Sequence, residues 1–189
     1  YWPYVDGNHS DPAATARYSE LMADSQHLIA NHILDAIKLK PQQRLLDIGG
    51  GTGTFARLAA ARFPKIETAV FDLPQVIASI APRYRGTTQL ISGNMFEDPI
   101  PKTFNTISLV RILHDHDDEP VDNLLARCFE ALPGGGELII AEPMADTRGA
   151  ESIGHTYFGF YLWAMGSGRP RTKHELQAAL ERAGFESIR

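Results

Sequence analysis

The chain of 189 residues is 43% hydrophobic and 22% charged, which is typical of a folded globular domain with one sizeable core. The formal net charge of −5, with no clustered stripe of Lys and Arg, argues against nucleic acid as a partner. The longest apolar run, residues 157–166, is too short to span a bilayer, so we expect a soluble, cytoplasmic protein and leave peripheral membrane contact open.

The first part of the chain, residues 1–40, is predicted to be a linker followed by a helical segment. Residues 1–10 show no period, whereas apolar residues recur at helical spacing over residues 12–38. Both ends of the sequence look cut. We therefore expect residues 1–40 to lead from a segment upstream, and residues 41–189 to form one domain that is incomplete at its C-terminal end.

Strands and helices alternate from residue 44 onward. Strands are predicted over residues 44–48, 66–73, 88–92, 105–112 and 137–142, and helices over residues 54–63, 74–80 and 119–132. Near-continuous apolar strands separated by crossover helices predict an α/β fold with a doubly wound, mostly parallel sheet. The single cysteine, Cys128, falls in a predicted helix, cannot form an internal disulfide and fits a reducing compartment.

Two further helices are predicted after the last of these strands. The first is an aromatic helix over residues 152–165, and a glycine-rich break follows it. The second opens with a capping box at Thr172 and Glu175 and ends at Gly184. Phe185 is predicted to begin the next strand.

The first strand runs into a glycine-rich turn that predicts a ligand site. Ligands of open parallel sheets sit beyond the carboxyl ends of the strands, and Gly49, Gly51 and Gly53 permit positive φ and close approach to the backbone there. A dinucleotide fingerprint needs a third glycine where this chain has Thr54. Asp47, directly before the glycines, favours a cationic ligand over a pyrophosphate.

Asp72, at the end of the second strand, adds an acid that can accept both hydroxyls of a ribose. Together with Asp47, it predicts S-adenosyl-L-methionine, an adenosyl compound that carries an ammonium and a sulfonium. The alternative is an ordinary tight turn, with Asp72 capping the helix that follows Leu73.

Five stretches of the sequence resemble a known family, the O-methyltransferases of the plant caffeate and flavonoid type and their bacterial relatives. They are residues 45–53, 71–74, 93–96, 112–115 and 131–135. Residues 111–120 and 168–172 are most similar to the bacterial branch that methylates hydroxylated carotenoids, the hydroxyneurosporene or demethylspheroidene enzymes. The resemblance implies the Rossmann-like fold of class I methyltransferases, a homodimer and an apolar hydroxyl acceptor. It also implies that residues 1–40 lead from an upstream dimerisation domain.

The resemblance also implies roles for residues of the cofactor site. Asp72 would hold the ribose, Met95 would pack on the adenine, and Asn94, at a position usually held by an acid, would bond the adenine amine. Arg111 could meet the carboxylate of the methionine moiety. The full set of expected cofactor residues is Asp47, Gly49, Gly51, Gly53, Asp72, Leu73, Asn94, Met95, Phe96 and Arg111.

Transfer of a methyl group to oxygen needs a base opposite the cofactor, and His114 is the candidate. It is predicted to lie at the carboxyl end of a strand, and the histidine of this His-Asp pair is the general base in the resembling family. Glu142, at the end of the next strand, could orient the imidazole or be a solvated strand-end acid. The plant enzymes carry a second glutamate where this chain has Pro170.

The acids that follow His114 invite a metal-site interpretation, which we do not adopt. Asp117, Asp118 and Glu119 precede Pro120, where acids complement a helix dipole, so we expect a solvated helix start and no metal. Three other functions stay open: C-methylation of a bacteriochlorophyll-type tetrapyrrole, a nucleotide-dependent oxidoreductase, and a non-catalytic binding module. The aromatic residues 157–165 suit either a long apolar acceptor or an interface.

Overall fold

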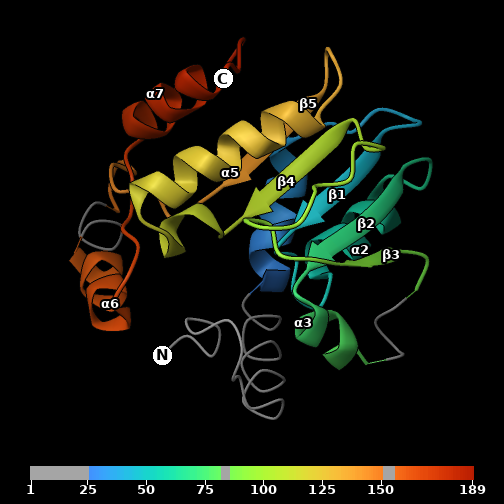
Figure 1. Ribbon diagram of the computed structural model, residues 1–189, viewed down its shortest axis with the longest axis horizontal. Helices are drawn as coiled ribbons and strands as arrows, with labels where there is room; N and C mark the ends of the chain where they lie inside the picture. Colours follow the sequence, from blue (N-terminus) through green and yellow to red (C-terminus); the bar gives the residue numbers. More distant parts are fainter. Residues whose placement is uncertain (1–25, 82–85, 151–155) are drawn as a thin grey trace.

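A parallel β-sheet forms the centre of the computed structural model, which describes residues 26–81, 86–150 and 156–189 (Figure 1). Its strands are β1 (Arg44–Ile48), β2 (Glu67–Asp72), β3 (Gln89–Ser92), β4 (Thr106–Val110) and β5 (Glu137–Ala141). They lie in the order β3-β2-β1-β4-β5, and every neighbouring pair is parallel. The predicted doubly wound sheet is confirmed. The direction of winding reverses between β1 and β4, where sheets of this kind bind ligands.

Helices cover both faces of the sheet. The described helices are one over residues 26–36, α2 (Thr54–Arg62), α3 (Pro74–Ser79), α5 (Asp118–Ala131), α6 (Phe158–Met165) and α7 (Lys173–Ala183), with a 3-10 turn at Leu113–Asp115. One buried cluster packs the sheet against α5 and α7, and a second packs it against α2 and the helix over residues 26–36. Figure 1 shows α6 on the side toward which the strands point.

The ends of α7 follow directly from its sequence. The hydroxyl oxygen of Thr172 accepts a hydrogen bond from the Glu175 N–H (3.2 Å), and the Thr172 N–H donates to the Glu175 carboxylate (2.8 Å). Gly184 ends the helix with a φ of 100°, in the left-handed region. The predicted capping box and glycine stop are therefore confirmed.

Two predicted strand positions are wrong. β4 ends at Val110 rather than at residue 112, because the chain bends at Arg111, whose φ is 59°. No strand begins at Phe185 within residues 185–189. The Phe185 ring instead packs edge-on against Phe129, and Ser187 has a φ of 56°, which extended backbone does not adopt.

Two parts of the prediction fall outside the described residues. They are the linker with the start of the helical segment, residues 1–25, and the first residues of the aromatic helix, 151–155. Within the part that the structure describes, no helix combines the length and apolar character needed to cross a membrane.

Candidate active site

The glycine turn after β1 is shaped for close approach to its backbone. Gly49, Gly51 and Gly53 all have positive φ, as predicted. A Cβ built on Gly51 would meet no atom within 4 Å, so the space above this residue is open. A Cβ on Gly49 would collide with the side chain of Ile112, which places the glycine turn against the loop that carries His114.

Asp47 and Asp72 bring two buried carboxyl groups to this turn. Asp47 is 1% exposed and accepts a hydrogen bond from the Ser108 hydroxyl (2.6 Å). Asp72 accepts from the Gly51 N–H (2.8 Å) and the Leu73 N–H (2.7 Å). Burial raises the pKa of Asp47 to about 7 and that of Asp72 to about 6. A cation nearby would stabilise the ionised form of both groups.

The loop after β3 holds the residues expected at the adenine. The side-chain oxygen of Asn94 accepts a hydrogen bond from the Phe96 N–H (3.0 Å), while the Asn94 N–H donates to Asp98 (2.8 Å). The amide oxygen expected to bond an amine therefore already has one donor. Arg127 of α5 fixes the loop by donating to the Met95 carbonyl (2.9 Å) and to the Asp98 carbonyl.

A tight bend follows β4 and sets the position of His114. Arg111 adopts positive φ and its N–H donates to the Ala141 carbonyl (2.8 Å). The Ile112 and Leu113 N–H groups then donate to the Glu142 carboxylate, at 2.8 and 2.7 Å. These bonds end the strand, so His114 lies in the 3-10 turn rather than at the strand's own end.

His114 and Glu142 are brought together by this bend. Their side chains are 5% and 3% exposed, and the His114 Nδ1 lies 2.6 Å from the Glu142 Oε2. A carboxylate at this distance accepts, so Nδ1 carries a proton and Nε2 is the ring nitrogen left to exchange one. Glu142 is thus buried and bonded, and the interpretation as a solvated strand-end acid is wrong.

Asp115 also meets the imidazole, which our list of site residues did not include. Its Oδ1 lies 3.0 Å from the His114 Nε2, without an aligned hydrogen-bond donor among the described residues. Burial and the charge of Glu142 raise the pKa of Asp115 to about 7, whereas a protonated His114 and the charge of Arg111 oppose this shift. The sequence could have indicated this residue, because Asp115 is the second residue of the His-Asp pair.

The acids at the start of α5 are bound by the protein itself. The Gly168 N–H donates to Asp117 (3.0 Å), and Asp118 pairs with Arg169 (3.2 Å) and Arg171 (2.8 Å). The expected solvated helix start is therefore only partly right, although Asp118 stays exposed. Over the described ranges, no three His, Cys, Asp or Glu side chains are grouped to hold a metal ion.

The comparisons with known proteins place this chain in a family. Residues 3–186 match the model of the O-methyltransferase domain. The chain is 43% identical, over its full length, to demethylspheroidene O-methyltransferase of Rhodobacter capsulatus and 41% identical to that of Cereibacter sphaeroides. It covers 48% and 52% of these proteins, so it spans about half the length of these curated relatives.

A solved structure supports the fold independently. Human N-acetylserotonin methyltransferase, crystallised with SAM, superposes with a TM-score of 0.86 at 23% identity, over 95% of this chain and 52% of the human protein. At that identity the likeness establishes the fold alone. Together with the family match, it confirms the Rossmann-like class I methyltransferase fold expected from the sequence.

Proposed function

Because the chain belongs to the O-methyltransferase domain family, we propose that it binds S-adenosyl-L-methionine and methylates a hydroxyl of an apolar small molecule. The observation that carries the proposal is the buried His114–Glu142 pair. His114 lies on a loop that packs against the glycine turn, at the point where the sheet reverses its winding. Such a pair provides a base beside a cofactor site.

The residues at the glycine turn fit this cofactor. Open space above Gly51 admits a ligand to the backbone, and the carboxyl groups of Asp47 and Asp72 would gain from a positive charge. The carboxylate of Asp72 is oriented by two backbone N–H groups and can still accept from ribose hydroxyls. When bound, S-adenosyl-L-methionine supplies a methyl group on a positively charged sulfur.

The remaining chemistry is the removal of a proton from the acceptor. Glu142 holds the proton of His114 on Nδ1, so Nε2 can accept the hydroxyl proton as the oxygen gains the methyl group. Glu142 then stabilises the charged imidazolium. Because the Asp115 Oδ1 lies 3.0 Å from Nε2, the Asp115 side chain has to move aside before the acceptor hydroxyl can reach Nε2.

The acceptor is proposed to be a hydroxylated carotenoid. The support is the activity for which the two relatives at 43% and 41% identity are named, the O-methylation of demethylspheroidene. Exposed aromatic side chains on and beside α6, those of Tyr157, Phe160 and Trp163, suit a long apolar molecule. The homodimer expected from the family resemblance is a further proposal for the full-length protein.

The test uses the protein with S-adenosyl-L-methionine labelled with ¹³C in its methyl group and demethylspheroidene as acceptor. We expect a product with an O-methyl carbon. His114→Ala should lower turnover by about 100-fold or more, because a positioned base contributes roughly that much. The matched control is His174→Ala, an exposed histidine on α7.

Three results would contradict parts of this proposal. A labelled carbon bonded to carbon would favour C-methylation. Cofactor binding without transfer to any hydroxyl would favour a binding module. Equal losses of turnover in the His114 and His174 variants would remove the assigned role of His114 as base.

A further inference from the structure

Arg171 contacts backbone carbonyls of the loop of His114, whereas Glu142 contacts its N–H groups. The side chain of Arg171 is almost fully buried, at 4% exposure, although it carries a permanent charge. We propose that Arg171 is a positioning residue that fixes the place of His114 in the active site. This inference rests on the proposed role of His114 as the base.

The guanidinium spans the two residues at the centre of the loop. Its Nη1 donates to the Leu113 carbonyl (2.7 Å), directly before His114. Its Nη2 donates to the His116 carbonyl (2.8 Å), directly after Asp115. One planar group therefore binds the backbone on both sides of the His-Asp pair, which only the fork of an arginine can do.

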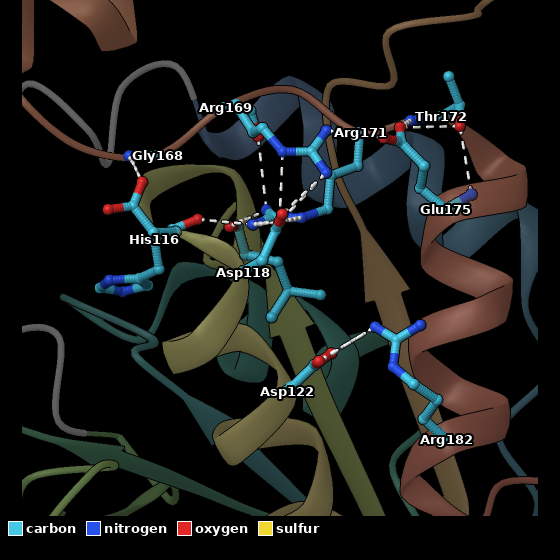
Figure 2. A network of polar contacts seen from close by, with 11 residues as sticks. His116, Asp118, Asp122, Gly168, Arg169, Arg171, Thr172, Glu175 and Arg182 are labelled. Atoms are coloured by element: carbon cyan, nitrogen blue, oxygen red, sulfur yellow. Dashed lines mark hydrogen bonds and ion pairs between the residues drawn. The ribbon is translucent and has the colours of Figure 1, made fainter.

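Asp118 fixes the guanidinium in this orientation. Its Oδ1 accepts from both the Nε (3.1 Å) and the Nη2 (2.8 Å) of Arg171, as Figure 2 shows. Asp118 is the first residue of α5, so the loop, the arginine and the start of that helix form one unit. Charge-assisted bonds of this kind are stronger than neutral ones.

Gly168 shows how closely the segment of Arg171 lies against the loop. A Cβ on this residue would collide with the His114 carbonyl oxygen and with the backbone of Asp115, and its φ is 81°. The Ser167 hydroxyl also donates to the Asp115 carbonyl (3.3 Å). The segment is thus packed on the backbone of the His-Asp pair, with no room for a side chain.

The loop is held by two charged groups as a result. Glu142, directly after β5, binds its N–H groups, and Arg171, directly before α7, binds its carbonyls. The contact at Arg171 is made 58 residues away in sequence, directly before the capped start of α7. Loss of this clamp would leave Nε2 of His114 free to shift relative to the acceptor.

The experiment compares Arg171→Lys with Arg182→Lys. Lysine keeps the charge at 171 but cannot bind both carbonyls. Arg182, an exposed arginine paired with Asp122 (2.8 Å), lies away from the loop in Figure 2 and is the matched control. The readouts are kcat and KM with demethylspheroidene, and the far-downfield proton resonance of His114 Nδ1, assigned by its loss in His114→Ala.

We expect Arg171→Lys to lower kcat by about 100-fold, as misplacement of a reacting group by roughly 1 Å can do, with KM for S-adenosyl-L-methionine within about twofold. The Nδ1 resonance should shift or broaden in this variant, whereas Arg182→Lys should leave both kcat and the resonance unchanged. If Arg171→Lys does not fold, Asp118→Ala, a change at an exposed side chain, should show the same losses to a smaller degree.

Unchanged kcat and an unchanged Nδ1 resonance in a folded Arg171→Lys protein would overturn the positioning role. A wild-type protein that transfers no methyl group to demethylspheroidene would instead count against the proposed function. The resonance does not depend on turnover, so the comparison of Arg171→Lys with Arg182→Lys would still decide the positioning role in that case.

Discussion

Glu142 binds three backbone N–H groups and one imidazole nitrogen with a single buried carboxylate. The same oxygens thus bend the chain after β4 and choose the tautomer of His114. The conformation of the loop and the protonation of His114 therefore both depend on the charge of Glu142. A glutamine at this position keeps the size of the side chain but removes the charge.

We expect Glu142→Gln to lower kcat by roughly 10- to 100-fold, because an amide N–H facing Nδ1 would favour the tautomer whose Nε2 is protonated. The free energy of unfolding should fall by about 1–3 kcal/mol, since the buried N–H groups lose a charged acceptor. Steady-state kinetics and urea unfolding measure the two effects. Glu130→Gln, at an exposed position on α5, is the control, and a kcat unchanged by Glu142→Gln would contradict the assigned role.

The sequence was sufficient to choose His114 and Glu142 because each follows a strand that could be recognised, and parallel strands end at one edge of a sheet. The role of Arg171 could not be predicted in this way. Its bonds go to backbone carbonyls of residues 113 and 116, and such long-range contacts leave no periodic signal. The internal hydrogen bond of the Asn94 oxygen was missed for a similar reason, because a local turn competes with a ligand for the same atom.

At the scale of elements, apolar runs and helical spacing predicted every described strand and α-helix between residues 44 and 142, but not the 3-10 turn at Leu113–Asp115. The end of β4 was placed too late because Ile112 and Leu113 continue the apolar pattern of the strand. What stops the strand is the carboxylate of Glu142, 30 residues further on. Tertiary contacts decided the boundary over local preference.

The α6 helix exposes more aromatic surface than a buried helix would. Trp163 is 80% exposed and Phe160 is 68% exposed. The helix itself lies on the side toward which the strands point (Figure 1). Large apolar side chains that are exposed next to one another often mark a binding surface. The element is therefore the proposed contact for the apolar part of the acceptor.

Trp163→Ala should raise KM for demethylspheroidene by about tenfold, because burial of a large aromatic side chain contributes at least about 1.4 kcal/mol. The free energy of unfolding should change by less than about 0.5 kcal/mol, since the side chain packs on little else. Kinetics and urea unfolding check both values. The control is Leu28→Ala, a side chain of 65% exposure on the helix over residues 26–36. Equal KM values for both variants would remove α6 from the acceptor site.

For the molecule as a whole, buried carboxyl groups make stability depend on pH. Folding raises the pKa of Asp47 from 3.8 to about 7, so the neutral form is favoured in the folded state. The contribution of protonated Asp47 to the stability of the fold is therefore complete below the pKa of this group in the unfolded chain. It is lost as the pH rises through about 7, the pKa in the folded state. His116, whose pKa burial lowers to about 4, has the opposite effect between about pH 4 and 6.5.

A comparison of variants isolates the contribution of Asp47. Asp47→Asn keeps an acceptor for Ser108 but cannot ionise. We compare the free energies of unfolding of the variant and the wild type, both without cofactor. The difference, variant minus wild type, should increase by about 1–3 kcal/mol when the pH is raised from 4.5 to 8. Urea unfolding at the two pH values measures the difference. A stability difference that does not change with pH would show that Asp47 does not titrate as described.

The central claim is that the glycine turn and Asp72 bind S-adenosyl-L-methionine, and titration calorimetry with this compound and with NAD tests it most directly. We predict that S-adenosyl-L-methionine gives heat of binding and that NAD gives none. The affinity for S-adenosyl-L-methionine should fall at least about tenfold in Asp72→Asn, because the variant loses a charged acceptor for the ribose hydroxyls. Binding of NAD without binding of S-adenosyl-L-methionine would contradict the account.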